Sequence, residues 1–135
     1  MRLLVTREMD YAMRVVRALD SGESLETAAI VAERERMSPA VTLKILKRLT
    51  AAGIVESRRG AAGGYRLRRP PEELTLYDLF RVFDKEPLLN RCQAADYRCE
   101  NDPEGTCGAC RELCRIQAIL DAELRRTPLS EMFAK

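Results

Sequence analysis

Apolar and polar positions follow a helical period through the first third of the chain. Between residues 6 and 19, apolar side chains recur every three or four positions, which predicts a helix with one buried face. Thr6 is a plausible N-cap for it. Ser24 is a second capping residue type, and the apolar positions after it predict another helix that ends near residues 36–37.

A third helix is predicted directly after the second. Ser38 stands at the cap and Pro39 at the first helical position, which is a strong start signal. The apolar pattern continues to about Ala52, and Gly53 ends the helix. Two short helices, a tight turn and a third helix with a basic outer face are typical of a helix-turn-helix.

A change to strand-like patterning follows. Residues 54–58 and 65–68 have strand character, and the turn of residues 59–64 between them contains three glycines. Pro70-Pro71 ends the second strand, because proline cannot donate a ladder hydrogen bond. The pattern predicts a β-hairpin with a basic tip, which is the wing of a winged helix.

The second half of the chain has two further predicted helices separated by an irregular segment. One helix starts at Thr75 with capping-box spacing and ends near Asp84. The other covers residues 108–126, carries a long apolar stripe and ends at Thr127-Pro128. Residues 85–106 show no sustained period. A loop of that length is uncommon unless something holds it in place.

These elements predict a mostly α fold with a small β-hairpin. We expect a winged helix-turn-helix DNA-binding domain over residues 1–70. Residues 71–135 then form a cysteine-rich loop and a long C-terminal helix.

Composition excludes several classes of function. The 135 residues include no histidine, which rules out Ser–His–Asp and Cys–His catalysis and any His-ligated metal site within the chain. No nucleotide-binding glycine loop or acid pair is visible, so we do not expect an enzyme. No apolar run approaches the roughly 20 residues that span a bilayer. The first ten residues meet charge too early for a signal peptide, so we expect a cytoplasmic protein without membrane contact.

Charge is concentrated in one segment. The net charge is +2 overall, yet residues 38–70 alone carry eight Lys or Arg against one Glu. A basic stripe of this kind is typical of a surface for a polyanion, here double-stranded DNA, although it could also serve another acidic partner. The predicted DNA contacts are Ser38, Ala40, Thr42, Leu43, Lys44 and Lys47 on the third helix, and Arg58, Arg59 and Arg66 on the hairpin.

All five cysteines lie in the last third of the chain: Cys92, Cys99, Cys107, Cys110 and Cys114. An odd, clustered set in a cytoplasmic chain favours a metal or cluster site over disulfides. The last three are spaced to share one face of a helix. An iron–sulfur cluster ranks first, structural zinc second and a thiol switch third.

Three segments together resemble a known family: MRLLVTREMDYAMR, ERERMSPAVTLKILKRLTAAGIVESRRG and, most specifically, GGYRLRRPPEELTLYDLF. They look like the IscR/NsrR/CymR family of bacterial winged-helix regulators, including its iron–sulfur-binding branch. The resemblance implies a homodimer built on the long C-terminal helix and a near-palindromic operator. It also implies a cluster in the loop between the last two long helices.

The resemblance also suggests ligands. Cys92, Cys99 and Cys107 match the three loop cysteines of cluster-binding members. In the [2Fe–2S] branch the fourth ligand is a histidine, and Cys110 stands at that position here. In the [4Fe–4S] branch it is an acidic residue of the partner protomer, which corresponds to Asp10. Cys114 is left as a spare thiol.

The recognition helix departs from the family pattern, since many members have an aromatic residue, Leu and Glu where this chain has Val41, Thr42 and Leu43. The operator sequence therefore cannot be transferred. The sequence as a whole predicts a dimeric DNA-binding transcription regulator controlled by an iron–sulfur cluster, [2Fe–2S] or [4Fe–4S]. A zinc-stabilised or thiol-switch regulator is the alternative. A small iron–sulfur redox protein fits less well.

Overall fold

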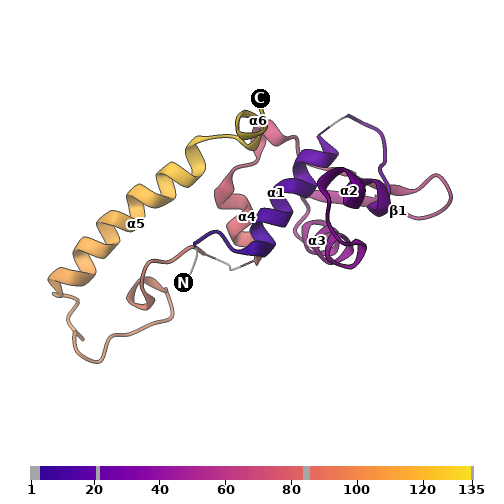
Figure 1. Cartoon of the computed structure of the whole chain (residues 1–135). Coiled ribbons are helices and arrows are strands. Elements are labelled where there is room, and N and C mark those ends of the chain that lie inside the picture. The colour runs from indigo at the N-terminus through magenta and orange to yellow at the C-terminus, as the bar shows by residue number, and fades with distance from the viewer. Residues whose placement is uncertain (1–3, 21, 84–85, 135) are drawn as a thin grey trace.

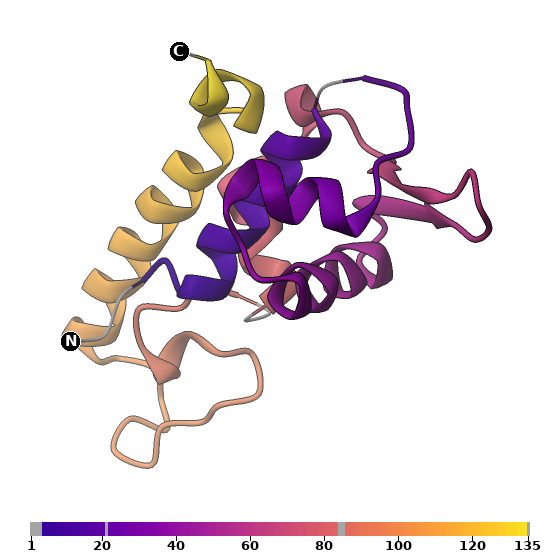
Figure 2. The same ribbon diagram turned by 45° about the vertical axis from the view of Figure 1, so that its right-hand side comes forward.

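The computed structural model describes residues 4–20, 22–83 and 86–134. Its elements are mostly helices with a two-stranded antiparallel hairpin, as the sequence predicts (Figure 1). Both views show the long helix α5 (Gly108–Arg126) on one side of the molecule and the hairpin on the opposite side (Figures 1 and 2). The helices between them carry the core.

Helix α1 (Arg7–Leu19) is the centre of that core. Its predicted cap is confirmed, because the Thr6 side chain accepts a hydrogen bond from the Met9 N–H at 3.3 Å. Met9, Ala12 and Val16 on its inner face are completely buried. Four other helices contact α1, and so does strand β2 (Gly64–Leu67). The four helices are α2 (Ala28–Glu35), α3 (Pro39–Ala51), α4 (Leu76–Phe83) and α6 (Leu129–Phe133), so α1 joins the two halves of the chain.

Helix α2 (Ala28–Glu35) begins later than predicted. Its N-cap is Thr27, whose side chain accepts from the Ile30 N–H at 3.3 Å, and not Ser24. The physical reason is an antiparallel bridge between Glu26 and Tyr65, with N–H···O distances of 2.8 and 2.7 Å in the two directions. This pairing holds the residues before Thr27 in an extended conformation.

Helix α3 (Pro39–Ala51) confirms the start and stop signals. The Ser38 side chain accepts from the Val41 N–H at 3.3 Å, and Pro39 occupies the first turn. After the helix, Gly53 adopts a φ of +76°, a left-handed conformation that glycine takes without steric cost. The third helix of the predicted helix-turn-helix is therefore bounded as expected.

Strands β1 (Val55–Arg58) and β2 (Gly64–Leu67) form the hairpin within one residue of the predicted boundaries. Gly64 is required where the hairpin meets the Glu26 bridge. A Cβ there would lie 2.7 Å from the Glu26 carbonyl oxygen, and the φ of Gly64 is +152°. The hairpin is thus seated against the start of α2.

The next three elements after the hairpin are a short 3-10 turn η1 (Pro71–Glu73), helix α4 (Leu76–Phe83) and a second turn η2 (Arg91–Gln93). The predicted start of α4 is supported by Asp78, whose carboxylate accepts from the Thr75 N–H at 2.9 Å. The end predicted near Asp84 lies outside the described residues.

Helix α6 (Leu129–Phe133) was not predicted. The Leu129 N–H donates to the Leu74 carbonyl at 2.7 Å, and the Leu129 side chain is completely buried. Leu74, Leu79 and Phe80 belong to the same buried cluster as the α1 residues. The core therefore crosses the expected boundary at residue 70.

Helix α5 packs far less tightly. It contacts α4 and η2, yet Gln117 is its only buried residue. Ile116, on the predicted apolar stripe, and Ile119 beside it are 40% and 52% exposed. Leu113, Leu120 and Leu124 are half-buried, so the middle of this apolar side is the part that a single chain leaves uncovered.

If the last helix completes the core, Leu129→Ala should lower the free energy of unfolding by about 2–5 kcal/mol, because it leaves a cavity among buried residues. Met132→Ala changes an exposed side chain of the same helix and should have little effect. Chemical denaturation of both variants tests this. Equal stabilities would contradict the packing of α6.

Candidate DNA-binding surface and cysteine site

The outer face of α3 carries most of the predicted DNA contacts. Ser38, Ala40, Leu43, Lys44 and Lys47 are exposed, with Leu43 exposed by 41%. They lie opposite Ile45, Leu46 and Leu49, which fill the core. This face is free to enter a groove.

Thr42 is an exception, and its predicted place on the exposed side is wrong. Its side chain is completely buried, and its hydroxyl donates to the Ser38 carbonyl at 3.0 Å. Back-bonding of this kind satisfies a threonine hydroxyl inside a helix. The three- and four-residue spacing from Thr42 to Ile45 and Leu46 was the sequence signal that places it on the inner face.

Basic residues from α3 and the hairpin meet at one hollow of about 640 Å³. Lys47 comes from α3, and Arg58 and Arg59 come from the hairpin. Thr27, at the N-terminus of α2, and Tyr65 are also among the residues that line it. A concave site with three cations suits a backbone phosphate.

Lys44 has an acidic neighbour. Its ammonium lies 2.5 Å from the Glu8 carboxylate of α1. The hydrogen bond from Lys44, together with the nearby charges of Lys44 and Arg48, lowers the pKa of Glu8 below its usual value. Arg48 itself lies over the Phe83 ring at 5.1 Å from the centroid. To bind a phosphate, Lys44 would therefore have to exchange the Glu8 carboxylate for the phosphate oxygens.

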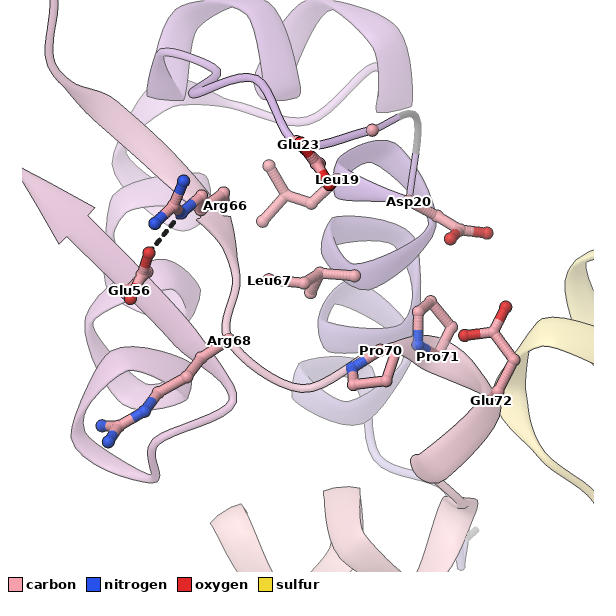
Figure 3. Close-up of a pocket in the computed structure, with 11 residues that line it drawn as sticks. Leu19, Asp20, Glu23, Glu56, Arg66, Leu67, Arg68, Pro70, Pro71 and Glu72 are labelled. Carbon is pink, nitrogen blue, oxygen red and sulfur yellow. Dashed lines mark hydrogen bonds and ion pairs between the residues drawn. The ribbon is translucent and has the colours of Figure 1, made fainter.

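Arg66 lies apart from Lys47, Arg58 and Arg59, in a hollow that it shares with Arg68. It is ion-paired with Glu56, its partner across the hairpin, and the hollow that it lines, of about 670 Å³, lies behind the wing (Figure 3). Asp20 and Glu72 also line that hollow. Burial, and then the nearby Glu72, raise the pKa of Asp20. The acidic side chains make this hollow a poorer phosphate site than the one at Lys47.

The structure brings four cysteines to one cavity. Cys92 from η2, Cys99 from the loop, and Cys107 and Cys110 at the start of α5 line a hollow of about 570 Å³. Cys114 lines a neighbouring hollow with Gln117 instead. All five thiols are free. Among the described residues, no three potential ligands already stand in metal-binding geometry.

Two of the thiols contact Cys110. Hydrogen bonding with Cys92 has the largest effect, followed by burial and by hydrogen bonding with Cys114, and together they raise the pKa of Cys110 to about 12. Cys110 is therefore a neutral thiol in the ligand-free chain. Metal binding would release its proton.

Polar side chains that sequence reasoning missed hold the loop. Asp102 accepts from the N–H groups of Thr106 and Cys107 at 2.8 and 2.9 Å, and these bonds lower its pKa. Gln93 donates to the Leu113 carbonyl at 2.8 Å and closes a capping box with Asn90. The spacing Asn90-x-x-Gln93 was a readable signal for this turn.

Gln117 ties the start of the loop to α5. Its carbonyl oxygen accepts from the Leu89 N–H at 2.8 Å, and its amide donates to the Pro87 carbonyl at 2.9 Å and to Asp121 at 2.7 Å. A buried, fully bonded amide fixes its surroundings strongly. Nothing in the apolar pattern marks this residue.

Asp10 lies on α1 and pairs with Arg14 at 2.9 Å. It does not line the cysteine hollow of its own chain. Separately, no described helix combines the length and apolar character needed to cross a membrane.

Comparison with known proteins gives consistent matches. A family model described as "Rrf2: Iron-dependent Transcriptional regulator" matches residues 5–135. "Protein aau3" of Rhizobium meliloti is 37% identical over 97 residues, covering 70% of this chain and 63% of the relative. The transcriptional regulator NsrR of Bacillus subtilis is 33% identical over 90 residues, covering 65% and 62%. The chain thus spans less than two thirds of these relatives.

The fold comparison agrees. The structure of CymR (YrzC), the global cysteine regulator of B. subtilis, superposes with a TM-score of 0.73 at 25% identity. The match covers 98% of this chain and 97% of that one.

The Glu8–Lys44 pair gives a pH-dependent prediction. Because the pKa of Glu8 is lowered on folding, the pair stabilises the fold at neutral pH and loses this effect as the pH falls through that pKa, below 4.5. Both side chains are more than 40% exposed, so Glu8→Gln should cost less than about 1 kcal/mol at pH 7. The cost should vanish near pH 3.

Urea unfolding at both pH values measures this, with Glu33→Gln on the exposed side of α2 as the control. A cost that is the same at both pH values would contradict an ionic origin.

Proposed function

The chain belongs to the Rrf2 family of transcriptional regulators, and we propose that it acts as a dimeric repressor or activator whose operator binding is controlled by an iron–sulfur cluster. Membership of this family makes it a DNA-binding regulator and not an enzyme. The observation that carries the finer proposal is that Cys92, Cys99, Cys107 and Cys110 line one hollow.

The DNA interface consists of the outer face of α3 and the hairpin. Ser38 and Ala40 would lie against base edges or backbone, and Lys44 and Lys47 would hold phosphates. Arg58 and Arg59 extend the same basic hollow onto the wing. Arg66 contributes only if a phosphate replaces Glu56 as its partner.

The donor set fits a cluster. Thiolates are the usual ligands of iron–sulfur centres, and four thiols here face one cavity with room for a polyatomic centre. Such a centre supplies a redox- and ligand-sensitive link between its protein ligands. Cys110 as fourth ligand suits [2Fe–2S], whereas Asp10 of the partner protomer in its place suits [4Fe–4S].

Control follows from where the ligands lie. Cys107 and Cys110 belong to the first turn of α5, whereas Cys92 lies in the turn that follows α4. Binding all of them to one centre would fix the loop against the start of α5. The exposed Ile116 and Ile119 make α5 the proposed dimer helix, so this fixation sets how the two winged helices are spaced. Only such a difference between states can change DNA affinity.

Zinc is the second candidate, because four thiolates also suit its tetrahedral geometry. The loop would then be a structural clamp without sensing. A thiol switch also remains, since Cys92 and Cys110 are in contact. A small redox protein is disfavoured because the basic hollow on α3 and the wing would have no role.

Removing single cations tests the DNA surface. Lys47→Ala and Arg59→Ala should each weaken binding to the gene's upstream DNA, and each should reduce the slope of log affinity against log salt by about 1. Arg126→Ala removes a cation paired with Glu123 at the far end of α5 and should leave the slope unchanged. Unchanged slopes in both test variants would refute the interface.

Anaerobic purification, followed by a visible spectrum and assays of iron, sulfide and zinc, tests the centre. Wild type should carry iron and acid-labile sulfide. Cys110→Ala should lose most of both, while the matched Cys114→Ala should retain them, because Cys114 does not line the hollow that the other four cysteines share. A colourless protein with one zinc per chain would show that the cysteines hold a structural zinc ion and not a cluster. Cluster loss in Asp10→Ala but not in Cys110→Ala would make Asp10 the fourth ligand.

A further inference from the structure

Two apolar side chains occupy the middle of the basic face of α3. Leu43 is 41% exposed and Ala40 is also exposed, because both lie on the side of the helix that faces away from the core. Lys44 and Lys47 follow Ala40 and Leu43 by four residues each, which places all four on adjacent turns of one helical surface. An apolar patch flanked by cations therefore faces outward.

The chemistry of α3 limits which bases it can read. Between Pro39 and Ala51 there is no Asn, Gln, Asp or Glu. Bidentate contacts to adenine and carboxylate contacts to cytosine are therefore absent from this helix. The Ser38 hydroxyl accepts the capping N–H, Thr42 is buried, and Glu8 beside the helix is paired with Lys44.

What remains on the outer face of α3 is apolar surface, the ammonium groups of Lys44 and Lys47, the Ser38 hydroxyl at its start and the Arg48 guanidinium, which lies over the Phe83 ring. The one apolar group that a base displays in the major groove is the C5 methyl of thymine. Ammonium groups reach phosphates or the acceptor edge of guanine. The surrounding positive charge attracts a polyanion, and under the proposed DNA-binding function that polyanion is DNA.

Building on the proposed DNA-binding function, we propose that Leu43, with Ala40 beside it, is the specificity-determining contact of this regulator and recognises thymine methyl groups in the major groove. Lys44 and Lys47 hold the helix at that depth through the phosphates. Sequence discrimination by α3 then depends on methyl contacts more than on hydrogen bonds to bases.

Replacing thymine by deoxyuridine tests this, because it removes only the methyl group. Full-length protein first selects duplexes from a random DNA pool. Each thymine of the selected duplex is then replaced in turn, and affinities are measured at one salt concentration. At one or more positions wild type should lose about fourfold in affinity, the value of one buried methyl.

Leu43→Ala should show less than a twofold loss at the same positions, because the contact is already gone. Alanine is the best helix former, and Leu43 lies outside the core, so the variant should fold. Met132→Ala, an exposed residue of α6, should keep the full deoxyuridine effect.

Equal deoxyuridine losses in wild type and Leu43→Ala, or no loss in either, would overturn the thymine contact. In that case salt-dependent binding weakened by Arg59→Ala would still support the proposed function. Absence of any DNA binding would overturn both.

Discussion

Burial of α1 is the constraint on which the rest of the structure depends. Its inner face is completely buried, and it contacts helix α3, strand β2 of the hairpin and helix α4 together. Close-packed interiors shift between discrete arrangements instead of deforming gradually. Helix α1 therefore couples the positions of α3 and α4 within one packed core. Leu79, Phe80 and Leu129 from the second half of the chain thus share one core with α1 and α3.

Local signals predicted most of the fold, and tertiary contacts decided the rest. Ser38-Pro39 and Gly53 specified α3 because caps and stops act within one turn. Ser24 and Thr27 are both good caps, and the choice between them depended on the Glu26–Tyr65 bridge, which joins residues far apart in sequence. Helix α6 is too short to show a period, and its position comes from the Leu74 carbonyl.

The same distinction between local signals and tertiary contacts applies to the candidate site. Cysteine spacing indicated candidate ligands, and four of these cysteines line one hollow. The side chains that hold the cysteine loop could not be predicted, since Asp102 and Gln117 bond to backbone groups, which no side-chain pattern reveals. Thr42 shows the opposite error, in which a polar residue type suggested exposure although its helical position is internal. Residue type predicts which chemical groups a side chain offers, whereas its position in the helix predicts whether that side chain is exposed.

The contact between Leu129 and Leu74 also constrains how the protein is made. The winged helix is encoded first, yet its core lacks a buried side chain until Leu129 has been synthesised. A nascent chain that has reached only the end of α5 still exposes apolar surface around Leu74 and Phe80. The ribosome-bound chain therefore gains this last buried contact of its core only after translation has passed the cysteine loop and the helix that follows it.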